Sequence, residues 1–233
     1  MAAVAEVIPT GVLIVDDDPL VRVGLSMIVG AASDLRVVGE AADGSAVASA
    51  VARLRPEVVL MDIRMPGVDG LAATELLRRL VDPPEVIVLT TFHADEYVLR
   101  ALRAGASGFL LKDTPPVEIL QAIRLVASGE PMLSPQVIRQ LISHVTASDG
   151  AGPSAGVASR TERATQLLGR LSQRELDVAL AVGCGKTNAE IGRELFMSLA
   201  TVKAHVSHAL TKLDLTNRVQ MALLVRDAGL ITE

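Results

Sequence analysis

The chain has 233 residues, of which 50% are apolar and 21% charged, and a net charge of −5. This length allows one or two domains, and so much apolar content excludes a disordered chain. No apolar run approaches the roughly 20 residues of a membrane span, no secretory signal is recognisable, and the single cysteine, Cys184, excludes a disulfide or a cysteine-cluster metal site within the chain. We therefore expect a cytoplasmic protein with no membrane partner. The net charge is −7 over residues 1–131 and +2 over residues 132–233, which predicts two domains with different partners.

The first half of the chain alternates between strand and helix patterns. Short apolar runs predict strands at Val12–Val15, Arg36–Val38, Val58–Met61, Val86–Leu89 and Phe109–Leu111. Helices are predicted between and after them, from Pro19 to about Gly30, over Ser45–Leu54, Leu71–Leu80 and Asp95–Ala104, and over Val117–Ala127. The first of these helices is indicated by Leu20, Val23, Met27 and Ile28 at helical spacing. Five βα units with short connections predict an α/β fold, a doubly wound five-stranded parallel sheet.

Polar side chains follow four of the five predicted strands. Asp16 and Asp17 follow the first strand, Asp62 the third, Thr90 the fourth and Lys112 the fifth. Because the carboxyl ends of parallel strands meet at one edge of a sheet, we expect these side chains to lie together. Crowded carboxylates repel one another unless a cation neutralises them, and oxygen ligands with an adjacent phosphate suit Mg²⁺. The sequence predicts a magnesium site at this edge.

The same residues predict phosphoryl transfer to a carboxylate. Lys112 offers a positive charge and Thr90 a hydroxyl to phosphate oxygens, and Asp62 is placed to act as the nucleophile. The alternative is that each residue is an independent helix cap or a surface charge.

Four segments of this half resemble the receiver domain of bacterial two-component response regulators. They are Val15–Pro19 (VDDDP), Met61–Gly70 (MDIRMPGVDG), Leu89–Thr90 and Gly105–Lys112 (GASGFLLK). The resemblance implies a flavodoxin-like fold in which Asp62 accepts phosphate from a sensor histidine kinase. It further implies that Asp16, Asp17 and Asp62 bind Mg²⁺, that Thr90 and Lys112 bind the phosphoryl oxygens, and that Phe109 is a switch aromatic moving with Thr90.

The last third of the chain is predicted to be all helical. A capping box, Ser172 with Glu175, begins one helix, Asn188 is predicted to cap a second, Ser198 caps a third that ends near Leu213, and a fourth covers Arg218–Ala228. The tight turn between the second and third helices predicts a helix-turn-helix. A linker with a short helix at Pro135–His144 and a breaker-rich stretch at 146–156 precedes this domain.

The third of these helices carries the predicted DNA contacts. Val202, Val206, Ala209, Leu210 and Leu213 form its packing face. We expect Lys203, Ala204 and Ser207 to face the major groove, and Thr201, His205 and Lys212 to meet phosphates. The residues alone leave open that this is an ordinary solvated helix face.

Residues 171–229 resemble the DNA-binding domain of LuxR-type regulators, and the pairing with a receiver is that of the NarL/FixJ subfamily. The resemblance is carried by Leu171–Glu175, Thr187–Gly192 and Ala200–Val206, although Leu199 and Asp214 stand where acids and glycine are frequent in that family. It implies a receiver at 10–129, a linker at 130–167 and a helix-turn-helix domain at 168–233. The implied partners are double-stranded DNA and a second copy of the chain, with RNA polymerase as a further candidate.

The sequence therefore predicts a non-enzymatic, phosphorylation-switched transcription regulator. Two alternatives remain. A phosphotransfer enzyme using Asp62 on small phosphoesters would leave the helix-turn-helix without a role. A regulator that binds DNA without phosphorylation would use the receiver as a dimerisation module.

Overall fold

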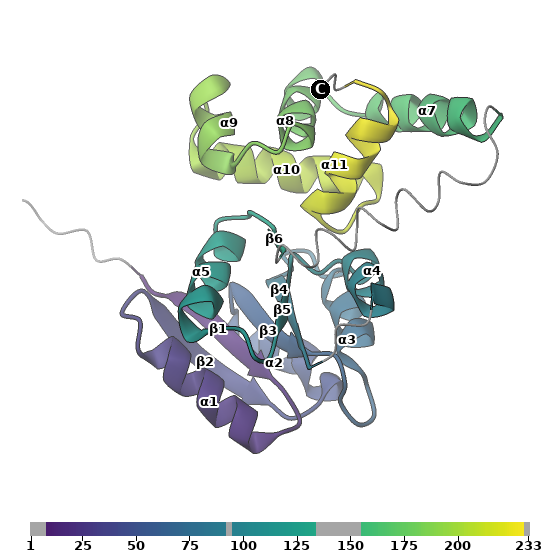
Figure 1. Ribbon diagram of the computed structural model, residues 1–233. Coiled ribbons are helices and arrows are strands. Elements are labelled where there is room, and N and C mark those ends of the chain that lie inside the picture. The colour runs from purple at the N-terminus through teal and green to yellow at the C-terminus, as the bar shows by residue number, and fades with distance from the viewer. Residues whose placement is uncertain (1–7, 92–94, 134–154, 231–233) are drawn as a thin grey trace, which may run out of the picture. The chain divides into compact units, whose positions relative to one another are not determined.

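The computed structural model describes residues 8–91, 95–133 and 155–230 (Figure 1). Contacts divide the chain into two compact units, one spanning Met1–Ala94 with Gly108–Ala127 and the other Asp95–Ser107 with Ser128–Glu233. None of the helices in the described ranges is long and apolar enough to cross a membrane.

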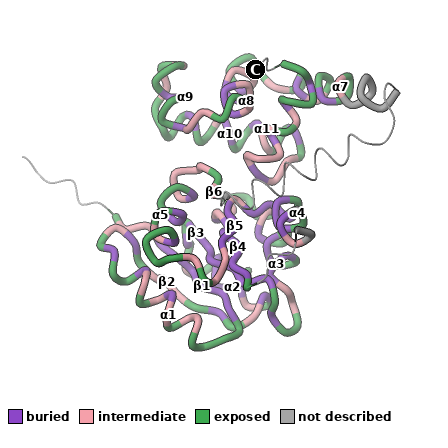
Figure 2. The backbone as a smooth tube through the Cα atoms, viewed as in Figure 1, coloured by how far each residue is buried: buried purple, intermediate pink, exposed green. Residues whose placement is uncertain are grey.

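The sheet has the predicted parallel topology. Its strands are β1 (Thr10–Val15), β2 (Leu35–Ala41), β3 (Val58–Asp62), β4 (Glu85–Thr90), β5 (Gly108–Leu111) and a two-residue β6 (Met132–Leu133), in the order β2-β1-β3-β4-β5-β6. The pairs from β2 through β5 are all parallel, which confirms the five-stranded parallel sheet; β6 was not predicted. Every residue of β3 is buried, as are all but the first residues of β1 and β4 (Figure 2). A strand buried on both faces needs helices on both sides of the sheet.

Helices cover both faces of this sheet. They are α1 (Pro19–Gly30), α2 (Val47–Leu54, preceded by a 3-10 turn at Gly44–Ala46), α3 (Gly70–Leu77) and α5 (Pro116–Ala127). Helix α4 (Asp95–Ala104) follows β4 in the chain and groups with the second unit. Helix α1 contacts α5, and α2 contacts α3, as expected for two helical layers with the sheet between them. The doubly wound α/β architecture is therefore confirmed.

Helix α1 is present, but the apolar residues that predicted it do not make its packing face. Leu20, Val23 and Met27 are 80%, 55% and 73% exposed. The buried residues of the helix are Leu25 and Val29. Apolar spacing thus identified the helix correctly without identifying the side that packs on the sheet.

The helices of the second unit that follow the sheet build a separate core. They are α7 (Ala155–Leu168), α8 (Gln173–Gly183), α9 (Asn188–Glu194), α10 (Leu199–Leu213) and α11 (Arg218–Asp227). The sequence did not predict α7, which contributes the buried residues Ala164 and Leu168 to this core. The predicted helix at Pro135–His144 lies outside the described residues.

Local capping defines the helix-turn-helix. Ser172 and Glu175 form the predicted capping box at α8, and Ser198 caps α10 as predicted. The cap of α9, however, is Thr187, whose side chain accepts from the Glu190 N–H, and Asn188 is the first helical residue instead. Thr187 is favoured as the cap because it forms a capping box with Glu190, in which each side chain accepts the backbone N–H of the other residue.

Candidate functional site

The sheet brings the predicted polar residues to one edge. Asp16 follows β1, Asp62 ends β3, Thr90 ends β4 and Lys112 follows β5. The strand register sets Val15 beside Met61, Asp62 beside Leu89, and Thr90 beside Leu111. In this sheet β2 lies on one side of β1, and β3 with the strands after it lies on the other. Ligands of such sheets bind at the carboxyl ends of the strands beside this point.

Three carboxylates converge there. Asp16, Asp17 and Asp62 each place an oxygen within 4.8 Å of the others. Asp16 is fully buried and Asp62 is 5% exposed, whereas Asp17 faces solvent. Asp16 Oδ1 accepts the N–H of Asp18 at 3.0 Å, while its Oδ2 is a buried oxygen that no donor meets at hydrogen-bonding angles among the described residues.

Lys112 lies between the two buried acids. Its Nζ is 2.6 Å from Asp16 Oδ2 and 3.2 Å from Asp62 Oδ2. Burial alone would lower the pKa of Lys112, but its contacts with Asp16 and Asp62 outweigh this effect, so that its pKa is raised. The ammonium therefore stays charged and partly neutralises the acidic pair.

Asp62 remains an electrostatically costly carboxylate in spite of Lys112. Burial, with a smaller contribution from the Asp16 charge, raises the pKa of Asp62 above its ordinary value. The Lys112 charge and a hydrogen bond from the Arg64 backbone N–H oppose this rise without cancelling it. An additional cation, or a change that removes the negative charge, would relieve the site.

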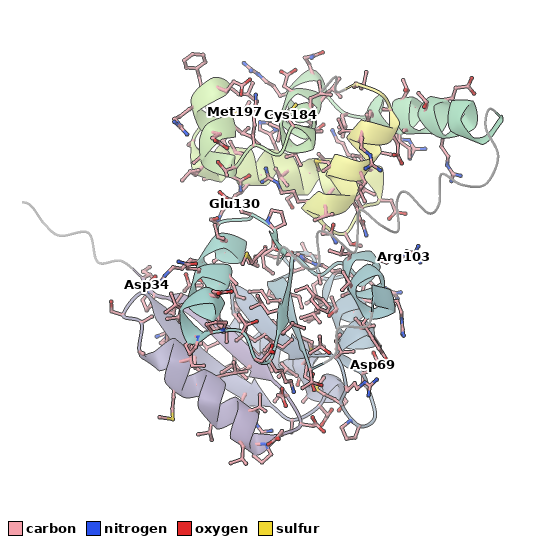
Figure 3. The ribbon with its side chains drawn as sticks, viewed as in Figure 1. Asp34, Asp69, Arg103, Glu130, Cys184 and Met197 are labelled. Carbon is pink, nitrogen blue, oxygen red and sulfur yellow. The ribbon has the colours of Figure 1, made fainter. Side chains whose placement is uncertain are left out.

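The loop after Asp62 is held by glycines. Gly70 begins α3, donates its N–H to Ile63 at 3.0 Å, and leaves no room for a side chain, since an added Cβ would lie 1.8 Å from the Asp62 carbonyl oxygen. Gly44 meets Val68 in the same way, with a Cβ position 2.4 Å from the Val68 carbonyl oxygen. Asp69, labelled in Figure 3, caps α3 through the Ala72 N–H. The loop after Asp62 is therefore fixed by close backbone contacts.

The two predicted switch residues are both buried. Thr90 is 3% exposed, and its carbonyl accepts the Lys112 N–H at 2.8 Å. Phe109 is 1% exposed and lies in β5 opposite Val88. The aromatic ring already occupies an interior position.

The residues present fit a hard divalent cation. All the candidate ligands are oxygens, the buried Asp16 Oδ2 has acceptor capacity left, and Asp17 is open to solvent and so compatible with metal-bound waters. Few carboxylates with several waters is the ligand set that Mg²⁺ prefers.

The predicted nucleic-acid face lies on α10. Val202, Val206, Ala209 and Leu213 are buried in the helical core, which matches four of the five positions predicted to pack, and Leu210 is half-buried. Five of the six predicted DNA contacts are exposed, namely Thr201, Lys203, Ala204, Ser207 and Lys212. The sixth, His205, is half-buried.

Thr201 and Lys212 have side-chain partners within the domain. The Thr201 hydroxyl shares a hydrogen bond with Ser198 at 2.8 Å, in the cap of α10. Lys212 Nζ lies 2.6 Å from Oε2 of Glu175, a carboxylate only 5% exposed. To meet a DNA phosphate, Lys212 would have to leave this ion pair, whereas Ala204 and Ser207 are exposed without such a constraint.

Glu175, Gly44 and Gly70 are structural contributors that the sequence indicated only in part. Glu175 was recognisable as a capping residue, but its ion pair with Lys212 spans 37 positions and has no local signal. Gly70 lay within a recognised motif, while nothing in the sequence pointed to Gly44.

A doubly wound sheet with this acidic edge, joined to a helix-turn-helix unit, defines a class of protein that receives a signal on one domain and reads DNA with another. The family comparisons agree. Residues 12–124 match the response regulator receiver domain, and residues 169–225 match the bacterial regulatory proteins of the luxR family. The chain belongs to the two-component response regulators that carry a LuxR-type DNA-binding domain and control transcription.

Relatives match over nearly the whole chain. The transcriptional regulatory protein LiaR of Bacillus subtilis is 39% identical over 91% of this chain and 94% of its own. The response regulator VraR of Staphylococcus aureus is 32% identical over 94% and 98%. Among solved structures, the response regulator ChrA of a heme-sensing two-component system aligns with a TM-score of 0.51 at 33% identity, covering 96% of this chain and 99% of its own.

Proposed function

We propose that this response regulator is switched by phosphorylation of Asp62 and then binds DNA through α10. The observation that carries the proposal is the pairing of Lys112 Nζ with both Asp16 and Asp62, 2.6 and 3.2 Å away, at an edge where three carboxylates meet. The Lys112 ammonium, together with a divalent cation held by the three acids, would offset the negative charge of the site and attract an incoming phosphoryl group.

The proposed chemistry is a transfer from the phosphohistidine of a sensor kinase. An oxygen of Asp62 forms a bond to phosphorus as the bond from phosphorus to the imidazole nitrogen breaks, so that Asp62 becomes an aspartyl phosphate and the kinase histidine is released. Lys112 and Thr90 then meet the phosphoryl oxygens. Asp16, Asp17 and Asp62 hold Mg²⁺, which when bound neutralises charge on the transferring group.

The proposed output is a change of surface that favours DNA binding as a homodimer. The aspartyl phosphate carries about −1.5 to −2 charge units beside Lys112, in place of the single charge of the carboxylate, and Thr90 and Phe109 respond to it. The proposed DNA contacts are Lys203, Ala204 and Ser207 in the major groove, with Thr201, His205 and Lys212 near phosphates. RNA polymerase is a further proposed partner at promoters, and the cytoplasm is the proposed location because DNA is the target.

Labelling by a small phosphodonor tests the acceptor. Incubation with acetyl phosphate and Mg²⁺ should give one phosphoryl group per chain, and the signal should be lost on removing Mg²⁺ with EDTA or in Asp62→Asn. Labelling that persists in Asp62→Asn would assign the acceptor elsewhere.

Salt dependence tests the DNA face. On a duplex selected from a random pool by the wild-type protein, Lys203→Ala should weaken binding and reduce the slope of log K against log salt by about 1. Lys186→Ala is the matched control, since it removes the same charge from the turn before α9, where Lys186 is paired with Glu194. Equal losses in both variants would remove Lys203 from the contact set.

A further inference from the structure

Arg22 of α1 is fastened to the backbone that carries two of the three clustered acids. Its Nη1 donates to the carbonyl oxygen of Asp16 at 2.7 Å and, at 3.3 Å, to that of Asp17. The side chain is 18% exposed, so that most of the guanidinium lies against the protein. No contact joins Arg22 to either acid's carboxylate in the described structure; both of these hydrogen bonds go to main-chain oxygens.

The other side of the guanidinium is held by β2. Arg22 Nε donates to Glu40 Oε2 at 3.2 Å, and the Ser26 hydroxyl donates to Glu40 Oε1 at 2.9 Å. The N–H of Asp16 is bound by the next residue of the same strand, Ala41, at 3.1 Å. The peptide groups on both sides of Asp16 are therefore fixed by neighbouring elements.

We propose that Arg22 is a positioning residue for the metal-binding acids, acting through the main chain of Asp16 and Asp17. The inference rests on the proposed function, in which these acids hold a divalent cation. The strand ends at Val15 and α1 begins at Pro19, so the acids lie in a short connection outside both elements. A planar guanidinium fixes the directions of its donors, so it holds two successive carbonyls and a carboxylate in one geometry, whereas the three donors of an ammonium rotate freely.

Charge alone gives the opposite expectation. A cation beside a metal site should repel the metal, so removing Arg22 would tighten binding if electrostatics dominated. Glu40 offsets that charge at 3.2 Å, which leaves the geometric effect to decide the outcome. As a stabilising contact the pair is weak, because Glu40 is 41% exposed and solvent screens exposed ion pairs.

Mn²⁺ binding to the full-length protein, followed by electron paramagnetic resonance of the free ion and by Mg²⁺ competition, provides a test that does not depend on phosphorylation. We expect Arg22→Ala to bind about ten- to a hundredfold more weakly, as is usual for residues that support metal ligands. The Mn²⁺ affinity of Arg22→Lys should fall between those of the wild type and Arg22→Ala. Arg36→Ala is the matched control. Arg36 is exposed on β2, the strand that carries Glu40, and lies at the end of that strand away from the acids, opposite Gly11.

The double variant Arg22→Ala/Glu40→Gln separates geometry from charge. Positioning predicts that it binds as weakly as Arg22→Ala, whereas an electrostatic role predicts a return to wild-type affinity. Tighter binding by Arg22→Ala, or losses equal to those of Arg36→Ala, would overturn the inference. If Arg22→Ala does not fold, Arg22→Lys carries the same test. Failure of the wild-type protein to bind Mn²⁺ would instead reject the metal site of the proposed function.

Discussion

The Asp62 carboxylate lies in an environment that opposes its own charge. It is 5% exposed, burial raises its pKa, and the nearby Asp16 raises it further. Because the pKa is higher in the folded than in the unfolded state, the ionised side chain reduces stability at pH values above the folded pKa, and this cost vanishes once both states are protonated. A cation bound here would therefore relieve an electrostatic cost that the folded protein carries without it.

Replacing this charge should stabilise the metal-free protein. Asp62→Asn is expected to melt at a higher temperature than wild type at pH 7 in EDTA, and the difference should shrink as the pH falls toward 4. Mg²⁺ should raise the melting temperature of wild type more than that of the variant. Circular dichroism melts across this pH range check both points, and a variant less stable than wild type at pH 7 would contradict them.

The missing side chain of Gly70 lets its backbone lie close to the Asp62 carbonyl oxygen. In Gly70→Ala the new Cβ would lie 1.8 Å from the Asp62 carbonyl oxygen, so the loop must shift. We expect a loss of about 1–3 kcal/mol of stability, as for an overpacked core site, together with slower labelling by acetyl phosphate. Gly24→Ala is the control, because Gly24 lies within α1 with nothing within 4 Å of its Cβ position, and it should gain about 0.5–1 kcal/mol. Equal effects at the two glycines would refute the steric account.

At the scale of elements, the buried carboxylate of Glu175 joins two helices of the DNA-binding domain, α8 and α10. Glu175 lies in the first turn of α8, where its Oε2 accepts from the Ser172 N–H at 2.8 Å, and it reaches Lys212 in the last turn of α10. The hydrogen bond from Lys212, followed by those from Ser172, lowers the pKa of Glu175 to about 2. This contact joins the first turn of α8 to the last turn of α10, the proposed recognition helix.

Glu175→Gln should therefore cost about 1–2 kcal/mol of stability in the helical domain. The folded pKa lies below the ordinary value of 4.5, so this stabilisation is present above pH 4.5 and is lost as the pH falls toward 2. Calorimetry at pH 7 and pH 3 should show the difference between variant and wild type shrinking with acid. Glu194→Gln removes the same charge from an exposed pair with Lys186 and should change stability by less than about 1 kcal/mol. A loss at Glu175 no larger than this would exclude a structural ion pair.

Helix α1 illustrates how an element can be predicted while its orientation is not. Leu20, Val23 and Met27 have helical spacing, yet they face solvent while Leu25 and Val29 are buried. Leu25 and Val29, four positions apart, form a second apolar stripe on the same helix, and only packing on the sheet chooses between the two stripes.

At the scale of the whole molecule, the proposed function requires a coupling free energy between phosphorylation of the receiver and DNA binding by the second domain. Wild type treated with acetyl phosphate and Mg²⁺ should sediment increasingly as a dimer and bind its selected duplex about 5- to 150-fold more tightly, the usual range of such coupling. Asp62→Asn should do neither. Equal affinity of wild type and Asp62→Asn, with and without phosphodonor, would favour a regulator that binds DNA without phosphorylation and uses the receiver as a dimerisation module.

The sequence by itself determined the architecture and gathered the candidate site. Five apolar runs in βα units dictate a parallel sheet, and parallel strands place Asp16, Asp62, Thr90 and Lys112 at a common edge whatever the loops do. The motifs around them and around α10 were enough to indicate the family. These features are local or follow from topology, so no tertiary detail was needed.

Only the tertiary structure decided which groups meet within that frame. The pairing of Lys112 with both Asp16 and Asp62, the hold of Arg22 on the acid-bearing backbone, and the Glu175–Lys212 ion pair join residues from separate elements. The burial of α7 residues in the helical core likewise had no periodic signal strong enough to predict it. Such contacts depend on the angles and depths at which elements pack, and side-chain spacing along the chain does not encode those quantities.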